Sequence, residues 1–364
     1  MSPFEGERSM ISRLLDAFQE MPQIEIVDHQ LEPHAAIDRG IDAHIQLEAA
    51  GRTMTLFVEI KQTAIYPRDV REILWRFRET DLFSKWGVLH TREIPFLAAE
   101  SISPGAKELL REECVGYYDT GGSVFLPARG AFYFKDKPVP KSAAKTVHAL
   151  FSGKRSQVAH ALLCNPENWV NVKSIAERAE VSTATASETL SALERFDWLQ
   201  TRGSGPSKER QLIQPSQLLD AWVKETNTNR RVSYRRFYVS MMKLEEMAYR
   251  IADICDRGDA NYVVTGEAAA QRYTPYLSNV SQLKCKLSSS KAFDRIIAEL
   301  DARPVDEGAN LLLVETKSTS EFLFKERIEG VWVASPILVY LDLIRGPGRS
   351  SEMADHLRQE RIGF

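Results

Sequence analysis

Three charged residues near the start of the chain have types and a spacing that suit metal-dependent chemistry. Asp42 precedes one apolar segment, and Glu59 and Lys61 belong to a second that begins near residue 56. Side chains two positions apart on a strand share a face, so Glu59 and Lys61 are predicted to point the same way. A turn at Gly51 forms a hairpin that brings Asp42, 17 positions before Glu59, beside it.

The chemistry of this set is phosphodiester hydrolysis. Carboxylates of Asp42 and Glu59 are predicted to hold Mg²⁺ or Mn²⁺ through oxygen, and the ammonium of Lys61 to steady a phosphate. Two alternatives remain open at this point. The Glu-x-Lys pattern also occurs on solvated strands, and Asp42 can instead pair with an arginine.

Helices and strands around this set are predicted from hydrophobic periodicity. A first helix carries Met10, Ile11, Leu14, Leu15 and Phe18, and a later one carries Val70, Ile73, Leu74 and Phe77. The later helix has Arg68, Arg71, Arg76 and Arg78 off its core face. Strands are predicted at residues 87–90 and 115–118, with a helix at residues 107–110 between them. The order is α-β-β-β-α-β-α-β.

This pattern over roughly residues 1–130 resembles the PD-(D/E)xK nuclease superfamily. The resemblance implies a restriction-endonuclease-like α/β domain with Asp42, Glu59, Lys61 and Gln62 as catalytic residues. It also implies an acidic residue on the first helix that assists the metal, for which Glu7 and Glu20 are the candidates. The sequence departs from the family at Ile41, where a proline is nominal. A domain that keeps the fold and only binds DNA is the alternative.

Composition describes an ordinary water-soluble protein of two or three domains. The 364 residues are 43% hydrophobic and 27% charged. No apolar run is long enough to span a membrane, and the first residues lack a basic start and an apolar core, so we expect a cytoplasmic protein. Four isolated cysteines favour neither a zinc site nor a disulfide framework. Phosphate-binding glycine loops and Ser-His or Cys-His arrangements are absent from the sequence.

Charge is distributed unevenly along the chain. Residues 154–236 contain 13 Lys and Arg against 9 Asp and Glu, whereas the flanking parts are acidic by 4 and 3 charges. A basic middle segment is typical of a nucleic-acid-binding module.

The middle segment is predicted to be a winged helix-turn-helix. A polar linker at residues 135–142 precedes helices at residues 157–163, 172–179 and 183–196. Ser182 is the predicted N-cap of the third helix. Strands at residues 198–201 and 211–213 flank a polar, glycine-rich wing at residues 202–210.

Duplex DNA is the predicted partner of this segment. Short polar side chains at the start of the third helix would meet bases in the major groove, and basic residues elsewhere would contact phosphates. A winged helix used only for docking another protein is the alternative. If a homodimer binds, its target should be two inverted half-sites. The predicted DNA-binding residues are Lys173, Ser182, Thr183, Thr185, Ser187, Arg202, Lys208 and Arg210, with Glu188 also near the helix start.

The last third is predicted to be an α+β domain after an arginine-rich stretch at residues 227–236, which is either a linker or a phosphate-contacting strand. The segments VVTGEAA at residues 263–269 and VASPILVYLDL at residues 333–343 resemble the C-terminal domain of AbiEi-type antitoxins, regulators from bacterial type IV toxin–antitoxin systems. The resemblance, with the winged helix, covers about residues 155–364. It implies operator binding and a nucleotidyltransferase-like toxin as partner. Typical members lack the front domain.

The sequence therefore predicts an α/β multidomain protein: a nuclease-like domain at residues 1–140, a winged helix-turn-helix at 141–226 and an antitoxin-like α+β domain at 227–364. The predicted function is a DNA-binding transcriptional regulator of the antitoxin kind. The alternative is a Mg²⁺- or Mn²⁺-dependent DNA endonuclease targeted by its winged helix.

Overall fold

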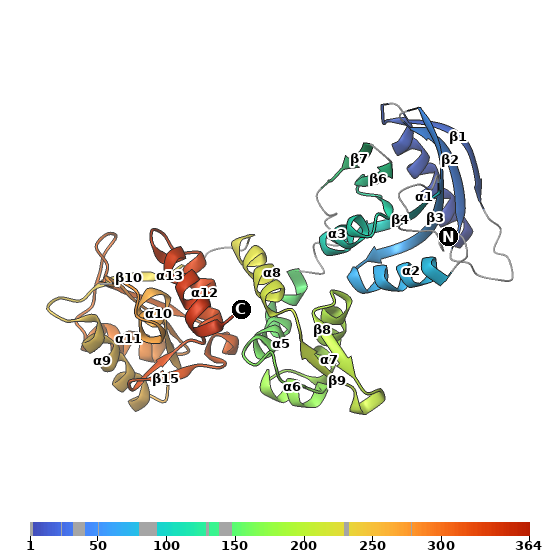
Figure 1. Ribbon diagram of the computed structural model, residues 1–364. Helices are drawn as coiled ribbons and strands as arrows, with labels where there is room; N and C mark the ends of the chain where they lie inside the picture. Colours follow the sequence, from blue (N-terminus) through green and yellow to red (C-terminus); the bar gives the residue numbers. More distant parts are fainter. Residues whose placement is uncertain are drawn as a thin grey trace. The chain divides into compact units, whose positions relative to one another are not determined.

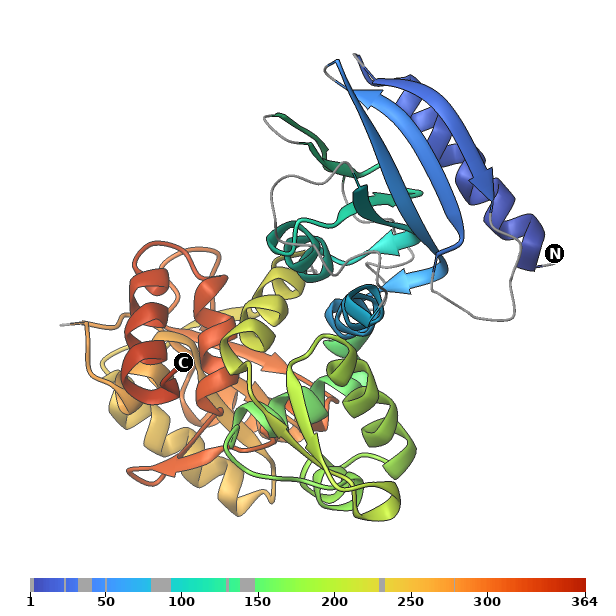
Figure 2. The same ribbon diagram turned by 45° about the vertical axis from the view of Figure 1, so that its right-hand side comes forward.

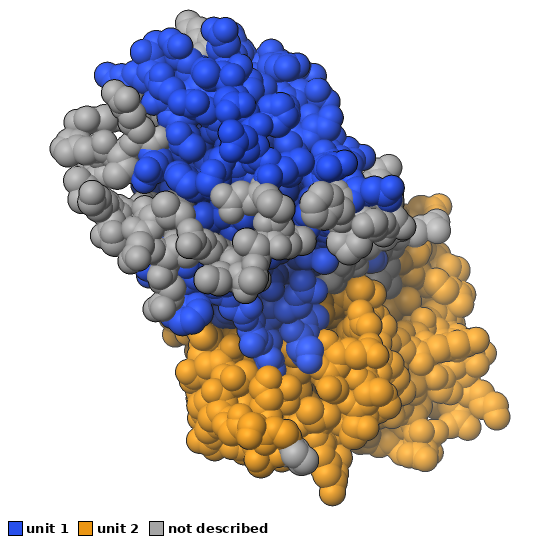
Figure 3. Space-filling model, turned by 90° about the vertical axis from the view of Figure 1, so that its right-hand side faces the viewer, with its two compact units in different colours: residues 1–148, 191–197 blue, residues 149–190, 198–364 orange. Residues whose placement is uncertain are grey.

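The computed structural model describes residues 3–22, 24–31, 41–49, 51–79, 93–128, 131–137, 148–228, 233–277 and 279–364. They belong to two compact units, which Figure 3 shows in different colours. Unit 1 contains residues 1–148 and 191–197, and unit 2 contains residues 149–190 and 198–364. Both units combine helices with sheets, so the predicted α/β multidomain class is confirmed. The predicted domain boundaries stay predictions, and the second and third predicted domains lie largely in one unit.

Unit 1 is built on one seven-stranded sheet with strands in sequence order (Figure 1). Strands β3, β4 and β5 are parallel, and the other neighbours are antiparallel. The predicted order α-β-β-β-α-β-α-β is present, and a hairpin that the sequence did not indicate follows it. The elements are α1 (Pro3–Gln19), β1 (Ile24–Leu31), β2 (Ala43–Ala49), β3 (Arg52–Ile65), α2 (Pro67–Glu79), β4 (Glu93–Ile102), α3 (Pro104–Glu112), β5 (Gly116–Asp119), β6 (Val124–Ala128) and β7 (Ala131–Lys135).

Helices cover both faces of this sheet. The apolar stripe of α1, which includes Leu14 and Phe18, packs with Leu56 and Val58 of β3 on one face. The stripes of α2 and α3 pack with Phe57 on the other face. Figure 2 shows α1 and α2 on opposite sides of the long strands. Because strand side chains alternate, the odd-numbered residues of β3 near its centre face α2.

One predicted strand of this unit cannot be compared with the structure. The strand predicted at residues 87–90 lies outside the described residues, and the described strand between α2 and α3 is β4. Of the predicted linker at residues 135–142, residues 138–142 also lie outside the described part. Lys135 is the last residue of β7.

The first part of unit 2 contains the three predicted helices and the predicted hairpin. They are α5 (Gly153–Leu163), α6 (Val172–Arg178), α7 (Thr183–Arg195), β8 (Leu199–Arg202) and β9 (Glu209–Leu212), followed by α8 (Pro215–Thr228). Ser182 caps α7 as predicted, because its Oγ accepts a hydrogen bond from Thr185 N at 3.1 Å. Ala186 and Leu190 of α7 are fully buried, so this face of the helix belongs to the core.

The second part of unit 2 is a mixed seven-stranded sheet in the order β13-β10-β14-β12-β11-β16-β15. Helices α9 and α11 pack together, and α10, α12 and α13 form a second group (Figure 1). The elements are β10 (Arg235–Tyr238), α9 (Leu244–Arg257), β11 (Tyr262–Thr265), α10 (Gly266–Tyr273), β12 (Leu283–Leu287), α11 (Ser290–Glu299), β13 (Arg303–Pro304), β14 (Leu311–Glu315), η3 (Thr319–Phe322), β15 (Glu326–Ile328), β16 (Val331–Val333), α12 (Pro336–Ile344), α13 (Ser350–Leu357) and a π-helical turn η4 (Arg358–Ile362).

The arginine-rich stretch at residues 227–236 is partly a strand. Residues 229–232 lie outside the described part, α8 ends at Thr228, and Arg235 and Arg236 belong to β10. Of the two alternatives left open by the sequence, a strand is therefore present at its end.

A buried contact joins the helical part of unit 2 to its sheet. His160 of α5 shares a 2.6 Å hydrogen bond between its Nε2 and Oγ of Ser335, the N-cap of α12. The His160 ring makes edge contacts with the rings of Trp222 in α8 and Phe324. Burial lowers the pKa of His160 to about 3. The imidazole is therefore neutral at ordinary pH, which suits an apolar junction.

Candidate functional site

The β2–β3 hairpin places Asp42 against the backbone of the strand that carries Glu59. Asp42 N donates to Val58 O at 2.8 Å, and Ile60 N donates to Asp42 Oδ2 at 2.6 Å. The side chain of Asp42 thus satisfies a strand N–H at the point where β2 begins. The structure therefore brings together Asp42 and Glu59, as the hairpin spacing predicts. Their catalytic and metal-binding roles stay predictions.

Glu59 is a buried carboxylate held by two cations. Its residue is 1% exposed, and its Oε1 is 2.8 Å from Lys61 Nζ and also bound by Arg76 Nη2. Its Oε2 is buried and has no hydrogen-bond donor among the described residues. Burial raises the pKa of Glu59, and the charges of Lys61 and Arg76 oppose this rise without cancelling it. Glu59 is thus an under-compensated carboxylate with one oxygen still available.

Arg76 is a residue of this cluster that sequence reasoning misplaced. The sequence assigned it to the solvent side of α2, along with Arg68, Arg71 and Arg78. Arg76 lies three positions after Ile73 and one before Phe77, both buried, so it borders the core stripe of α2. This spacing is the sequence signal that could have placed Arg76 at the edge of the core. Arg78 instead pairs with Glu113 at 2.6 Å, away from Glu59.

Gln62 and the two glutamates of α1 are placed differently from the catalytic set. Gln62 follows Lys61 on β3, so its side chain points to the opposite face, where it packs against Gly6 of α1. Glu7 is the next residue of α1, whereas Glu20 follows the other end of the helix and lies 3.9 Å from Lys135 Nζ. Of the two candidates, Glu7 is the one adjacent along the chain to Gly6, the residue that lies against Gln62. A role for Gln62 stays a prediction.

The residues at this site fit a divalent cation only in part. Asp42 and Glu59 offer hard oxygen ligands, and the orphaned Oε2 of Glu59 is a free acceptor. However, Lys61 and Arg76 already balance the two carboxylates. No group of three or more His, Cys, Asp or Glu side chains that could hold a metal occurs in the described part of the chain. Water and a phosphate would have to complete the coordination.

The first turn of α7 is exposed. Ser182 and Thr183 are exposed, and Thr185 and Ser187 are half-buried. Ser182 Oγ lies 3.0 Å from Thr185 Oγ1, so the two hydroxyls form part of the helix cap. Lys173 of α6 is also exposed. The structure therefore leaves these predicted residues accessible at the start of one helix and on its neighbour.

The hairpin after α7 differs from expectation at one residue. Arg202 is exposed, pairs with Glu209 at 2.7 Å and has its guanidinium 4.3 Å from the centre of the Trp169 ring. Lys208 is half-buried. Arg210 is only 6% exposed, and its backbone pairs with Val170, which turns this position inward. The prediction that Arg210 contacts phosphate is therefore corrected: a buried guanidinium is not accessible to DNA.

Glu188 of α7 is exposed but paired. Its carboxylate lies 2.8 Å from Arg155 of α5. This pair reduces the negative charge near the start of α7, where a phosphate would approach.

The antitoxin-like motifs meet at a buried lysine that the sequence did not single out. Lys286 of β12 is 4% exposed, and its Nζ lies 2.8 Å from both Asp342 Oδ2 and Glu321 Oε2. Thr265 Oγ1 donates to the same Asp342 oxygen at 2.6 Å. Burial acts to lower the pKa of Lys286, but the two carboxylates outweigh it and raise the pKa above its usual value. Asp342 is therefore a partner in a charge cluster and not a plain polar residue of the helix.

Glycine at position 266 is explained by the same region. Its φ is +66°, and a Cβ there would lie 3.0 Å from Lys284 Cδ. Glycine adopts this left-handed backbone conformation at the start of α10 with little strain, whereas a residue with a Cβ would be strained.

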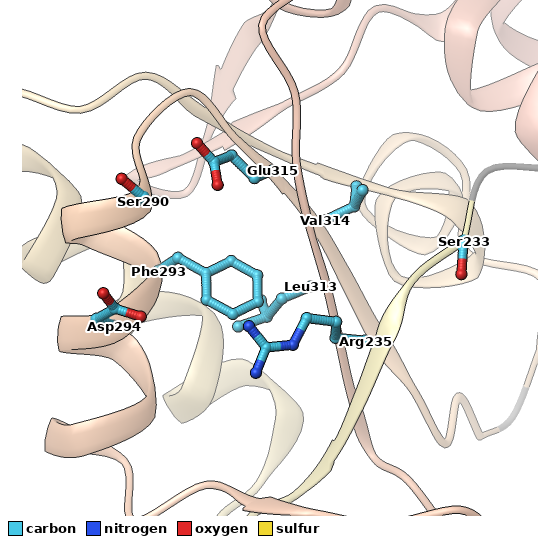
Figure 4. A pocket seen from close by; sticks show the side chains of 8 residues that line it. All are labelled: Ser233, Arg235, Ser290, Phe293, Asp294, Leu313, Val314 and Glu315. Carbon is cyan, nitrogen blue, oxygen red and sulfur yellow. The ribbon is translucent and has the colours of Figure 1, made fainter.

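A pocket of about 290 Å³ lies elsewhere in the C-terminal sheet (Figure 4). The guanidinium of Arg235 lies 4.7 Å from the centre of the Phe293 ring. Carboxylates of Asp294 and Glu315 also line the pocket, so its charges are mixed. None of the predicted site residues belongs to it. Its lining residues are Ser233, Arg235, Ser290, Phe293, Asp294, Leu313, Val314 and Glu315.

Comparison with known proteins supports the predicted resemblance of the C-terminal part. Residues 211–363 match the sequence model of a family described as "Transcriptional regulator, AbiEi antitoxin, Type IV TA system". The match includes α8 and the C-terminal sheet, and it begins after α5, α6 and α7. The predicted resemblance of the last third to AbiEi-type antitoxins is confirmed. No curated protein matches the chain.

A solved structure described as "Structure of EndoMS in apo form" also matches. The two chains are 15% identical with a TM-score of 0.21, over 33% of this chain and 47% of that chain. The matched region is thus less than half the length of that protein, and a TM-score this low does not establish a shared fold.

None of the described helices is long and apolar enough to cross a membrane.

Proposed function

We propose that the chain is a double-stranded DNA-binding transcriptional regulator of the type IV antitoxin kind with a nuclease-like front domain. The observation that carries this proposal is the antitoxin-family match at residues 211–363, in the same compact unit as α5, α6 and most of α7. In the proposal, these helices and the β8–β9 hairpin act as a winged helix-turn-helix on duplex DNA.

The start of α7 is the proposed reading surface. Exposed Ser182 and Thr183 present hydroxyl groups, and the unpaired N–H groups of a helix N-terminus favour phosphate oxygens. Thr185 and Ser187 continue the same polar surface. Hydroxyl groups can donate to or accept from base edges in the major groove. Lys173 on α6 adds a phosphate contact.

Arg202 is the proposed phosphate contact of the hairpin. Its position over Trp169 restricts the guanidinium before DNA arrives, which reduces the entropy lost on binding. Glu209 is its partner in the free protein, and a phosphate can replace that carboxylate. Lys208 on the same hairpin contributes a second cation.

Two proteins are proposed as further partners. A nucleotidyltransferase-like toxin is the counterpart implied by the antitoxin resemblance, and a second copy of the chain would match an inverted pair of half-sites. Size-exclusion chromatography with light scattering, on the protein alone and with DNA, distinguishes a monomer from a dimer.

Fluorescence anisotropy with duplexes selected from a random library tests the DNA proposal. Thr185→Ala should reduce the preference for the selected duplex over random DNA by about tenfold, which corresponds to one lost base contact. Arg202→Ala should weaken binding to all sequences and reduce the slope of log K against log salt by about 1. Lys291→Ala, at an exposed position of α11, is the control that removes one positive charge elsewhere. Equal affinity for selected and random DNA contradicts specific recognition.

A second candidate function is metal-dependent cleavage of DNA. The observation that favours it is the convergence of Asp42, Glu59 and Lys61 on the β2–β3 hairpin. Cleavage of duplex, branched and single-stranded DNA should be measured with Mg²⁺ or Mn²⁺ added and withheld. Lys61→Ala should abolish metal-dependent nicking and leave DNA binding unchanged. No nicking of any substrate by the unaltered chain rejects this function.

A further inference from the structure

The Asp42–Glu59 site contains an extra cation beyond the Asp…Glu-x-Lys set. Arg76 reaches from α2 to Glu59 Oε1, the same oxygen that Lys61 approaches at 2.8 Å. Two cations therefore face two carboxylates, and the site is balanced without any bound ion. Glu59 Oε2 remains without a donor among the residues that the structure describes.

We propose that Arg76 determines the cation preference of this site: its guanidinium occupies the side of Glu59 that a divalent cation would take, so the unaltered chain binds Mg²⁺ or Mn²⁺ weakly. Glu59 can coordinate a divalent ion once Arg76 leaves, with Asp42 as the second carboxylate. Lys61 stays in place, because its spacing on β3 fixes it beside Glu59.

Electrostatics makes the two cations exclusive. A divalent ion bound at Glu59 would lie within a few ångströms of the guanidinium, and like charges that close repel strongly in a partly buried site. Mg²⁺ also dehydrates reluctantly and is usually held through one or two carboxylates. With Lys61 and Arg76 both present, Asp42 and Glu59 supply no net negative charge to offset that cost. Without Arg76 the site carries one negative charge.

Arg76 is also placed to move. Its side chain is 36% exposed, whereas that of Glu59 is 1% exposed. A long arginine side chain at the edge of the core can rotate into water, where its charge is well solvated. Glu59 has no such freedom. The exchange of Arg76 for a metal therefore requires rotation of one side chain and no rearrangement of the sheet.

The affinity of the full chain for Mn²⁺ tests this inference. Electron paramagnetic resonance measures the concentration of unbound Mn²⁺ during a titration. Arg76→Ala should bind Mn²⁺ at least tenfold more tightly than the unaltered chain. Arg78→Ala is the matched control, because Arg78 lies on the same helix and pairs with Glu113 away from the site. The double variant Glu59→Gln with Arg76→Ala should lose the gain. Equal Mn²⁺ affinity for Arg76→Ala and the unaltered chain overturns the inference.

A second variant guards against misfolding. Arg76→Lys keeps a positive charge but a compact one that cannot form the same fork, so it should give an intermediate affinity. If Arg76→Ala does not fold, as judged by circular dichroism, Arg76→Lys decides, and an affinity no tighter than that of the unaltered chain also overturns the proposal. The inference about Arg76 rests on the proposed metal-dependent cleavage only because that function suggests Mg²⁺ or Mn²⁺ as the ion to test. Tight Mn²⁺ binding without cleavage keeps the inference and rejects the nuclease, and neither result depends on DNA binding by unit 2.

Discussion

The two units each bury one charged side chain between two opposite charges, and they do so with inverted signs. In unit 1 the carboxylate of Glu59 lies between Lys61 and Arg76. In unit 2 the ammonium of Lys286 lies between Asp342 and Glu321. Both groups have raised pKa values, but for opposite reasons. Burial dominates at Glu59, whereas the partner charges dominate at Lys286.

This difference separates a site open to a ligand from a structural cluster. A raised pKa favours the neutral form of an acid and the charged form of a base. Lys286 is thus held firmly as a cation by its partners, and Thr265 adds a hydrogen bond to Asp342. Glu59 keeps one buried oxygen without a donor among the described residues. The first arrangement stabilises the fold, and the second can accept a divalent cation once Arg76 leaves.

The largest expected effect is the loss of the lysine from unit 2. Lys286→Met leaves Asp342 and Glu321 close together without a counter-charge in a largely buried region. We expect a loss of about 3 kcal/mol of unfolding free energy, as for other broken buried pairs. Urea unfolding followed by tryptophan fluorescence measures it. Lys284→Met, on the same strand and half-buried, is the control and should lose less than about 1 kcal/mol. Equal losses would show that Lys286 has no special role.

The next largest expected effect is a pH dependence of the unfolding free energy that is caused by Glu59 in unit 1. Its pKa in the folded state is above the ordinary value of 4.5, so the folded chain holds this proton more tightly than the unfolded chain. The stabilisation is complete below the ordinary value and is lost as pH rises through the raised one. Glu59→Gln removes this loss, so its stability relative to the unaltered chain should increase with pH, by about 1.4 kcal/mol for each unit of pKa shift.

Thermal unfolding between pH 4 and pH 8 measures that dependence. Glu113→Gln, which removes the half-buried partner of Arg78, is the control and should show no such trend. Parallel curves for Glu59→Gln and the unaltered chain would mean that the cations compensate Glu59 fully, and the contrast between the units would disappear.

The smallest effect sharpens the description of the unit 2 cluster. Thr265→Val keeps the shape of the side chain and removes the donor to Asp342. A single hydrogen bond to a charged group contributes about 1.5 kcal/mol, so we expect a loss of that order in urea unfolding. The same substitution in a Lys286→Met background should lose a different amount, because the two partners share one carboxylate oxygen. Strict additivity would show that the contacts act independently.

Local periodicity was enough to predict the elements that carry the front site. Alternation on a strand placed Glu59 and Lys61 on one face, and the short turn at Gly51 fixed Asp42 opposite them. The short polar residue at position 182 likewise predicted the N-cap of α7. In these cases the information lies within one element or one hairpin.

The misplaced residues all depend on contacts between distant elements. The sequence of α2 alone predicts that Arg76 is solvated, and only the packing of α2 on β3 brings it to Glu59. The sequence of the hairpin alone predicts that Arg210 is exposed, and only the pairing of its strand with Val170 turns it inward. Strand β12 alternates leucine or cysteine with lysine, which is typical of a strand with one face in water. Only the helix that covers that face, through Asp342, makes Lys286 a buried residue. Patterns along a chain do not contain this information.

The hydrogen bond between His160 and Ser335 has a consequence for communication within unit 2. With a pKa of about 3, the imidazole keeps its uncharged form throughout the physiological range, so acidity does not loosen this junction. A ligand that favours one packing of α5 on α12 changes the affinity of a second ligand only if the second ligand also distinguishes the packings, and the effect is then reciprocal. If DNA binds the helices as proposed and a partner protein binds the C-terminal sheet, this junction is where the two binding events could be coupled.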